Sequence, residues 1–130
     1  MSDLPLLIAV IDDDASVRTA MRRLLHLSGY DVATFESGEA FLAALPQIQA
    51  ACALLDVQMP GLSGFEVAQA IRATSLHPPI VFMTANTDEW LQSRVDATAE
   101  ARLLRKPFPT EALLATIEGL TSAARGGPKN

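Results

Sequence analysis

Five residues with chemically active side chains stand at the ends of short apolar runs in this sequence. Asp12 and Asp13 follow one run, and Asp56 follows another. Thr84 and Lys106 follow two later runs. If the runs are parallel strands of one sheet, their carboxyl ends lie at the same edge. The pattern therefore predicts that these side chains meet in one site.

The residue types predict a site for a divalent cation and a phosphoryl group. Crowded carboxylates repel one another and need a cation or protons. The candidate ligands are all oxygens, with no His or Cys at ligand spacing, which favours Mg²⁺, or Mn²⁺ as a substitute. Lys106 adds a positive charge and Thr84 adds a hydroxyl donor. One carboxylate could then act as the nucleophile toward a phosphoryl group.

The elements that must position these residues alternate between strands and helices. Strands are expected at residues 6–11, 31–35, 51–55, 80–83 and about 102–105. Asp14 and Ser37 are expected to cap the first two helices, and Ser63 with Glu66 has the spacing of a capping box. A fourth helix is expected at about residues 88–97, and a fifth from near Pro109. Five strands alternating with five helices predict one doubly wound parallel α/β sheet.

Composition narrows the class of protein. With 130 residues the chain suits one domain, which we place at residues 1–123, followed by a disordered tail at 124–130. The net charge of −5 argues against nucleic-acid binding by this domain. The N-terminus lacks the basic start of a signal peptide, and its apolar run is too short to span a membrane. These features, with the single cysteine Cys52, favour a cytoplasmic protein.

The ordered motifs resemble those of bacterial response-regulator receiver domains. The matching segments are Asp12-Asp13, the run from Asp56 through Met59-Pro60-Gly61 to Gly64, Thr84-Ala85, and Lys106-Pro107-Phe108. The similarity covers about residues 6–120, and the spacing is most similar to nitrogen-fixation regulators that carry a separate DNA-binding domain. It implies a flavodoxin-like fold with strand order 2-1-3-4-5.

The resemblance also implies a role for each site residue. Asp56 would be the phosphoacceptor, and Thr84 and Lys106 would contact the phosphoryl group. The Mg²⁺ ligands would be Asp12, Asp13, Asp56 and the backbone carbonyl of Gln58, with Asp12 binding through water. The Lys106–Pro107 peptide bond is expected to be cis, which proline makes accessible.

Function follows from the same resemblance. The phosphodonor would be a phosphohistidine on a sensor histidine kinase or a phosphotransfer protein. The domain would catalyse only its own phosphorylation and slow dephosphorylation, so it would not be an enzyme in the usual sense. The signal would leave through the surface of helix four, strand five and helix five, and the same surface could serve a homodimer.

Two positions depart from the family pattern. Most relatives have Phe or Tyr three residues before the Lys as a rotating switch, whereas this chain has Leu103. Relatives also have a Gly-Ala pair after helix four, whereas residues 97–101 here contain no glycine. We therefore expect an unusual end to helix four, and a switch that does not depend on an aromatic side chain.

Three other functions fit part of the pattern. A haloacid-dehalogenase-type phosphatase would share the acidic strand end, Thr84 and Lys106, but it needs further acids after the lysine and no Asp follows. A flavodoxin-like flavin carrier would need a glycine- and hydroxyl-rich loop where three aspartates stand. A receiver that binds partners without being phosphorylated would keep the same fold.

Overall fold

The computed structural model describes residues 5–75 and 77–124. The strands are β1 (Leu7–Ile11), β2 (Asp31–Phe35), β3 (Ala50–Asp56), β4 (Ile80–Thr84) and β5 (Ala101–Arg105). The helices are α1 (Ala15–Leu27), α2 (Gly38–Ala44), the short 3₁₀ helix η1 (Leu45–Gln47), α3 (Gly64–Arg72), α4 (Trp90–Asp96) and α5 (Thr110–Ala124).

The five strands form one sheet in the order β2-β1-β3-β4-β5, and all neighbouring pairs are parallel. This confirms the predicted doubly wound α/β fold. The chain first turns from β1 to β2 and later places β3 on the other side of β1, so the strand order reverses between β1 and β3. A reversal of this kind opens a crevice at the carboxyl ends of the strands, where ligands of such sheets bind.

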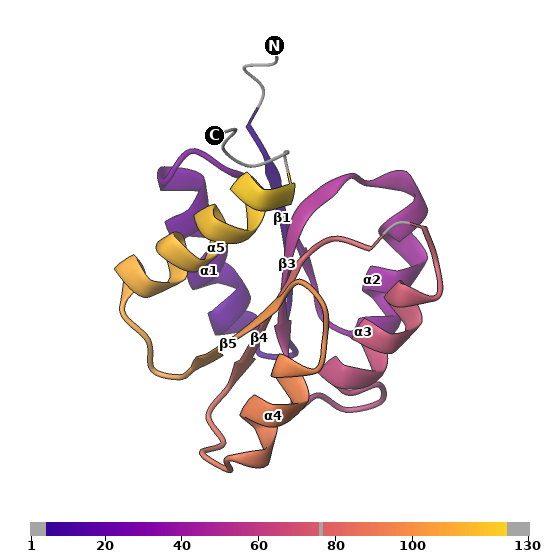
Figure 1. The fold of residues 1–130 in the computed structure, drawn as a ribbon. Coiled ribbons are helices and arrows are strands. Elements are labelled where there is room, and N and C mark those ends of the chain that lie inside the picture. Colours follow the sequence, from indigo (N-terminus) through magenta and orange to yellow (C-terminus); the bar gives the residue numbers. More distant parts are fainter. Residues whose placement is uncertain (1–4, 76, 125–130) are drawn as a thin grey trace.

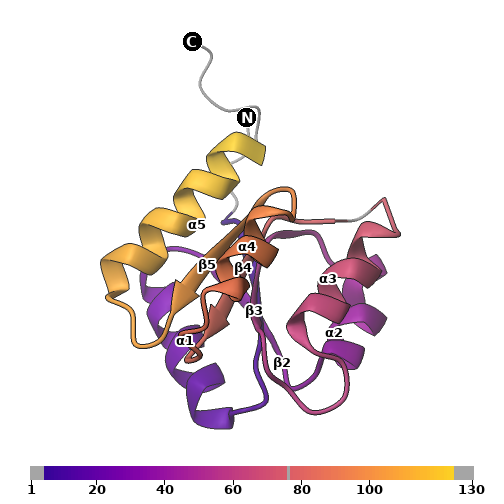
Figure 2. The same cartoon turned by 60° about the horizontal axis from the view of Figure 1, so that its bottom comes forward.

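Helices cover both faces of the sheet, with α1 and α5 on one side and α2 and α3 on the other (Figure 1). A second view shows the same layers, with α5 and α1 together and α2 beside α3 (Figure 2). Successive strand residues serve opposite faces. Ile8 and Val10 pack with α1 and α5, whereas Ala9 and Ile11 pack with α2, α3 and α4. The sheet thus separates two apolar cores, which explains why its strands are apolar throughout.

The helix starts that position the site follow the expected capping chemistry. Asp14 accepts hydrogen bonds from the N–H groups of Ser16 and Val17 at the start of α1. Ser63 and Glu66 form the predicted capping box at the start of α3. These caps fix where each helix leaves the carboxyl edge of the sheet.

Some boundaries differ from the sequence expectations. Strand β3 extends one residue further at each end than predicted, so Asp56 is the last residue of the strand, and Thr84 likewise ends β4. Helix α4 is seven residues long, shorter than the expected 88–97, because the residues before it form hydrogen-bonded turns instead. Helix α5 runs to Ala124, one residue beyond the expected domain end, and residues 125–130 of the predicted tail lie outside the described residues.

Among the described residues, no helix combines the length and the apolar character that crossing a membrane requires.

Candidate functional site

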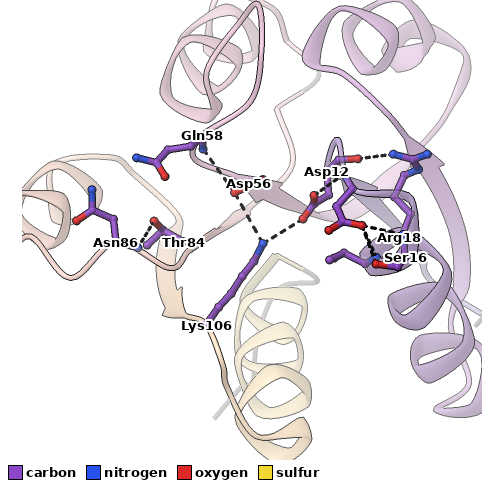
Figure 3. Close-up of polar contacts among 10 residues, drawn as sticks. Asp12, Ser16, Arg18, Asp56, Gln58, Thr84, Asn86 and Lys106 are labelled. Atoms are coloured by element: carbon purple, nitrogen blue, oxygen red, sulfur yellow. Dashed lines mark hydrogen bonds and ion pairs between the residues drawn. The ribbon is translucent and has the colours of Figure 1, made fainter.

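The sequence-predicted site residues meet at the carboxyl edge of the sheet. Asp12 directly follows β1, Asp56 ends β3, Thr84 ends β4 and Lys106 directly follows β5. Figure 3 shows the Lys106 side chain reaching between Asp12 and Asp56, with Thr84 on the neighbouring strand. The fold therefore brings side chains that are up to 94 residues apart in sequence into contact.

Three carboxylates form the acidic centre of this site. Asp12 and Asp56 are buried, with 1% and 8% of their surface exposed, whereas Asp13 is exposed. One oxygen from each of the three carboxylates lies within 4.8 Å of the others. An all-oxygen donor set this compact, reached from solvent on one side, suits a hard divalent cation such as Mg²⁺.

Lys106 provides the positive charge of the site. Its Nζ lies 3.2 Å from Asp12 Oδ2 and 3.9 Å from Asp56 Oδ1. The Lys106–Pro107 bond is cis, as predicted. The ammonium group balances part of the carboxylate charge, so the site retains a net negative charge that a cation can neutralise.

The environment of Asp56 disfavours its charged form. The pKa of the Asp56 carboxyl is raised to about 6, chiefly by burial and also by the nearby Asp12 carboxylate. Lys106 and the N–H of Gln58 act in the opposite direction on the same pKa. At neutral pH Asp56 is therefore mostly ionised but poorly stabilised, as suits a carboxylate that a cation or a phosphoryl group would relieve.

Each polar group of Asp12 takes part in a hydrogen bond or an ion pair. Its Oδ1 accepts from the N–H of Asp14 (2.9 Å), and its own N–H donates to the carbonyl of Phe35 (3.1 Å). Arg18 donates from Nη1 to the Asp12 carbonyl (2.8 Å). Arg18 was not singled out from the sequence. Its spacing of six residues from Asp12, which brings the first turn of the helix back to the strand end, was the available signal.

Thr84 and Gln58 lie beside the acidic centre. Thr84 is buried, and its Oγ1 accepts a hydrogen bond from the N–H of Asn86 (3.0 Å). Among the described residues, no hydrogen bond joins Thr84 to Asp56. The N–H of Gln58 donates to Asp56 Oδ1 (3.4 Å), which places the backbone at Gln58 beside the carboxylate.

The loop after β3 passes very close to Asp56. A Cβ atom at Gly64 would lie 2.5 Å from the Asp56 carbonyl oxygen and 2.9 Å from the Cα of Val57. Both contacts are with backbone, which cannot move aside cheaply. The N–H of Gly64 donates to the Val57 carbonyl (2.9 Å), so α3 begins directly against the end of β3. Glycine at position 64 thus permits the loop that surrounds the site.

The two departures from the family pattern have visible structural counterparts. Leu103 is half-buried and packs against the core that α2, α3 and α4 share with the sheet. After α4 the chain turns at Glu100, whose φ is 56°, the one positive φ of a non-glycine residue in the described part of the chain. The Glu100 carbonyl then accepts from the N–H of Ile80 (3.0 Å), which joins this turn to β4.

Comparison with known proteins agrees with this architecture. A family model for the response regulator receiver domain matches residues 8–118. The chain is 37% identical to the transcriptional regulatory protein FixJ of Bradyrhizobium diazoefficiens, over 95% of this chain and 60% of that protein. The chain spans less than two thirds of the length of that relative.

Solved structures show the same fold. The chemotaxis protein CheY4 of Vibrio cholerae superposes with a TM-score of 0.83 at 30% identity, covering 89% of this chain and 98% of that one. Full-length FixJ from B. japonicum superposes with a TM-score of 0.83 at 37% identity, covering 91% of this chain and 58% of that one. These matches do not favour the phosphatase or flavin-carrier alternatives. The chain belongs to the response regulator receiver domain family, the phosphoacceptor modules of two-component systems.

Proposed function

We propose that Asp56 accepts a phosphoryl group in a Mg²⁺-dependent reaction. The observation that carries the proposal is the contact of Lys106 Nζ with both Asp12 and Asp56, beside a third carboxylate within 4.8 Å. This arrangement concentrates positive charge next to one buried nucleophilic carboxylate. The three carboxylates repel one another, so a cation bound among them would relieve that repulsion.

Each residue has a distinct role in the proposed transfer. A carboxylate oxygen of Asp56 attacks the phosphorus of a phosphohistidine, the P–N bond breaks, and the bonding electrons leave on the imidazole nitrogen. Lys106 neutralises charge on the phosphoryl oxygens, and the Thr84 hydroxyl donates a hydrogen bond to one of them. The product is an acyl phosphate on Asp56, which water later hydrolyses.

The proposed cation ligands are Asp12, Asp13, Asp56 and the backbone carbonyl of Gln58. Bound there, Mg²⁺ or Mn²⁺ would supply charge neutralisation for the phosphoryl oxygens. Asp12 is restrained by its hydrogen bonds to Asp14 and Arg18, so this ligand is oriented before the cation binds. Preorganisation of this kind lowers the cost of assembling the site.

The partners and the setting are part of the same proposal. The donor is a sensor histidine kinase or a phosphotransfer protein, and the chain turns over no other substrate. The output surface is α4, β5 and α5, which also serves a homodimer, and this domain does not bind nucleic acid directly. We place the protein in the cytoplasm, where the buried thiol of Cys52, whose pKa burial raises to about 12, stays reduced and unreactive.

The proposal is tested by labelling the purified chain with a small phosphodonor such as acetyl phosphate in the presence of Mg²⁺. Mass spectrometry should locate one acid-stable, base-labile phosphoryl adduct on Asp56, and Asp56→Asn should abolish it. Asp14→Asn is a matched control, because Asp14 caps α1 and should leave labelling intact. Absence of an adduct on the wild-type chain would favour the receiver that binds partners without phosphorylation.

A further inference from the structure

The β4–α4 loop, residues 85–89, is organised around the Thr84 hydroxyl. The N–H of Asn86 donates to Thr84 Oγ1 (3.0 Å), and the N–H of Asp88 donates to Asn86 Oδ1 (2.8 Å). The indole N–H of Trp90, the first residue of α4, donates to Asp88 Oδ2 (3.3 Å). The Thr84 hydroxyl oxygen is therefore bound to a loop that continues into α4.

Arg105 holds this loop from the neighbouring strand β5. Its Nη1 donates to the carbonyl of Asn86, and its Nη2 donates to the carbonyl of Asp88 (3.3 Å). The Arg105 side chain is half-buried. Hydrogen bonds from a charged donor are stronger than neutral ones, and the planar guanidinium can reach two acceptors at once. The position of the loop thus depends on the end of β5.

Lys106, the residue after Arg105, extends its side chain to the acidic centre. The N–H of Lys106 donates to the Thr84 carbonyl (2.7 Å), and its Nζ lies 3.9 Å from Asp56 Oδ1. Figure 3 shows the Lys106 side chain directed toward Asp56, while the Thr84 hydroxyl is turned toward Asn86. Two adjacent residues therefore connect the site and the loop: Lys106 approaches Asp56, and Arg105 hydrogen bonds to the β4–α4 loop.

The described side chains of β5 other than Arg105 do not hydrogen bond to the β4–α4 loop. Leu103 carries no polar group and packs into the core, so it cannot form or release a hydrogen bond to the loop. Arg102 is exposed and donates to the carbonyl of Ala101 (3.0 Å), within its own strand. Among the described side chains of β5, Arg105 is the one that hydrogen bonds to the β4–α4 loop.

We propose that Arg105 is a positioning residue of the phosphoryl site. It holds the β4–α4 loop in the conformation in which Thr84 accepts from Asn86, and it thereby opposes movement of Thr84 toward a phosphoryl group on Asp56. This inference rests on the proposed function of Asp56. When only a fraction of molecules is competent to bind, the apparent affinity falls by that fraction. Weakening the Arg105 contacts should therefore increase affinity for a phosphoryl mimic.

Beryllofluoride, prepared from beryllium and fluoride salts, provides the phosphoryl mimic for the test. Isothermal titration calorimetry at saturating Mg²⁺ measures its affinity for the wild-type chain and for variants at position 105. Arg105→Gln should bind beryllofluoride roughly three- to tenfold more tightly than wild type, because the competent fraction rises. Arg105→Lys keeps the charge but loses the two-pronged geometry, so its affinity should lie between the two.

Arg102→Gln is the matched control on the same strand, and it should bind beryllofluoride as wild type does. Mg²⁺ affinity, titrated separately, should not change in any of the three variants. A folded Arg105→Gln protein whose beryllofluoride affinity is equal to or weaker than that of wild type overturns the inference. If Arg105→Gln does not fold, Arg105→Lys decides by the same criterion. A wild-type chain that does not bind beryllofluoride contradicts the proposed function, and the inference with it.

Discussion

At the scale of single residues, the site is governed by repulsion among carboxylates that one ammonium group only partly offsets. Burial and the Asp12 charge raise the pKa of Asp56, whereas Lys106 lowers it. The net result is a pKa of about 6 in place of 3.8. Ionised Asp56 therefore destabilises the folded state at neutral pH, and a bound cation or a phosphoryl group on Asp56 would relieve this cost.

The raised pKa of Asp56 predicts a specific pH dependence of stability in the absence of divalent cations. Between pH 4 and 6 the folded state binds more protons at Asp56 than the unfolded state does, so the free energy of unfolding falls as pH rises. The loss should be on the order of 2 to 3 kcal/mol, and it should be complete above about pH 7. Asp56→Asn should lack this component.

Urea unfolding in chelator at pH 4.5 and pH 7.5 measures the effect. The advantage of Asp56→Asn over wild type should be larger at pH 7.5, because the asparagine mimics the protonated acid at every pH. An equal advantage at both pH values would contradict the raised pKa.

Mg²⁺ should stabilise the folded chain by occupying the acidic centre. A ligand that binds only the folded state raises stability by mass action. Asp13→Asn removes one carboxylate from the exposed side of the pocket. In chelator this variant should melt slightly above wild type, because repulsion is reduced, whereas its melting temperature should rise much less on addition of Mg²⁺. Thermal melts with and without Mg²⁺ distinguish this from the opposite pattern, which would count against the site.

At the scale of the elements, the close approach of α3 to β3 controls the position of Asp56. Gly64→Ala would place a methyl group 2.5 Å from the Asp56 carbonyl oxygen, so backbone would have to shift. We expect a loss of at least about 2 kcal/mol in stability and slower labelling of Asp56.

Gly119→Ala is the matched control for that substitution. A Cβ atom at Gly119, within α5, would meet nothing within 4 Å. Alanine favours a helix over glycine by about 1 kcal/mol, so this variant should be stabilised and label normally. Chemical denaturation and the labelling rate give both readouts. Equal stability effects at the two glycines would show that the contact at position 64 is unimportant.

The turn after α4 holds Glu100 in the left-handed region, with a φ of 56°. A non-glycine residue in the left-handed region costs about 1–2 kcal/mol, part of which glycine recovers. Glu100→Gly should therefore raise the free energy of unfolding by about 0.5–1 kcal/mol. Ala97→Gly, at a residue whose φ is −81°, should lower it instead. Urea denaturation of the two variants compares them, and a destabilised Glu100→Gly protein would be the contrary result.

The elements and the pocket residues were largely predictable from sequence, for a physical reason. Buried parallel strands need continuous apolar runs, and caps such as Asp14 and Ser63 mark helix starts, so the polar residue at each strand end stands out. A hydrogen bond from a long side chain to a distant backbone carbonyl leaves no comparable pattern in the sequence. Arg18 and Arg105 bond to carbonyls whose positions depend on loops, and carbonyls belong to every residue type. The late start of α4 was missed for the same reason.

At the scale of the whole molecule, the site residues lead into helices on both faces of the sheet. Asp12 leads into α1 on one face, while Asp56 leads through its loop into α3 on the other. Thr84 leads into α4, a helix of seven residues that contacts α3 through Phe65, where the Arg94 guanidinium carbon lies 4.5 Å from the ring centroid. Isolated helices this short are unstable, so α4 depends on its packing. We therefore expect α4 and its preceding loop to respond to a change at Thr84.

Phosphorylation of Asp56 should change the conformation of the molecule chiefly through Thr84 and α4. A phosphoryl group adds about −1.5 to −2 charge at neutral pH and attracts the Thr84 hydroxyl. The N–H of Asn86 donates to Thr84 Oγ1, so movement of Thr84 should break this bond, displace the β4–α4 loop and shift α4. Leu103 has no hydroxyl to expose and pairs with Phe82 in the sheet, so it should remain inward in both states. NMR spectra with and without beryllofluoride should show the largest shifts at residues 84–88 and in α4, with little change in the Leu103 methyl groups. A silent α4, or a large change at Leu103, would show that the signal leaves the pocket by another route.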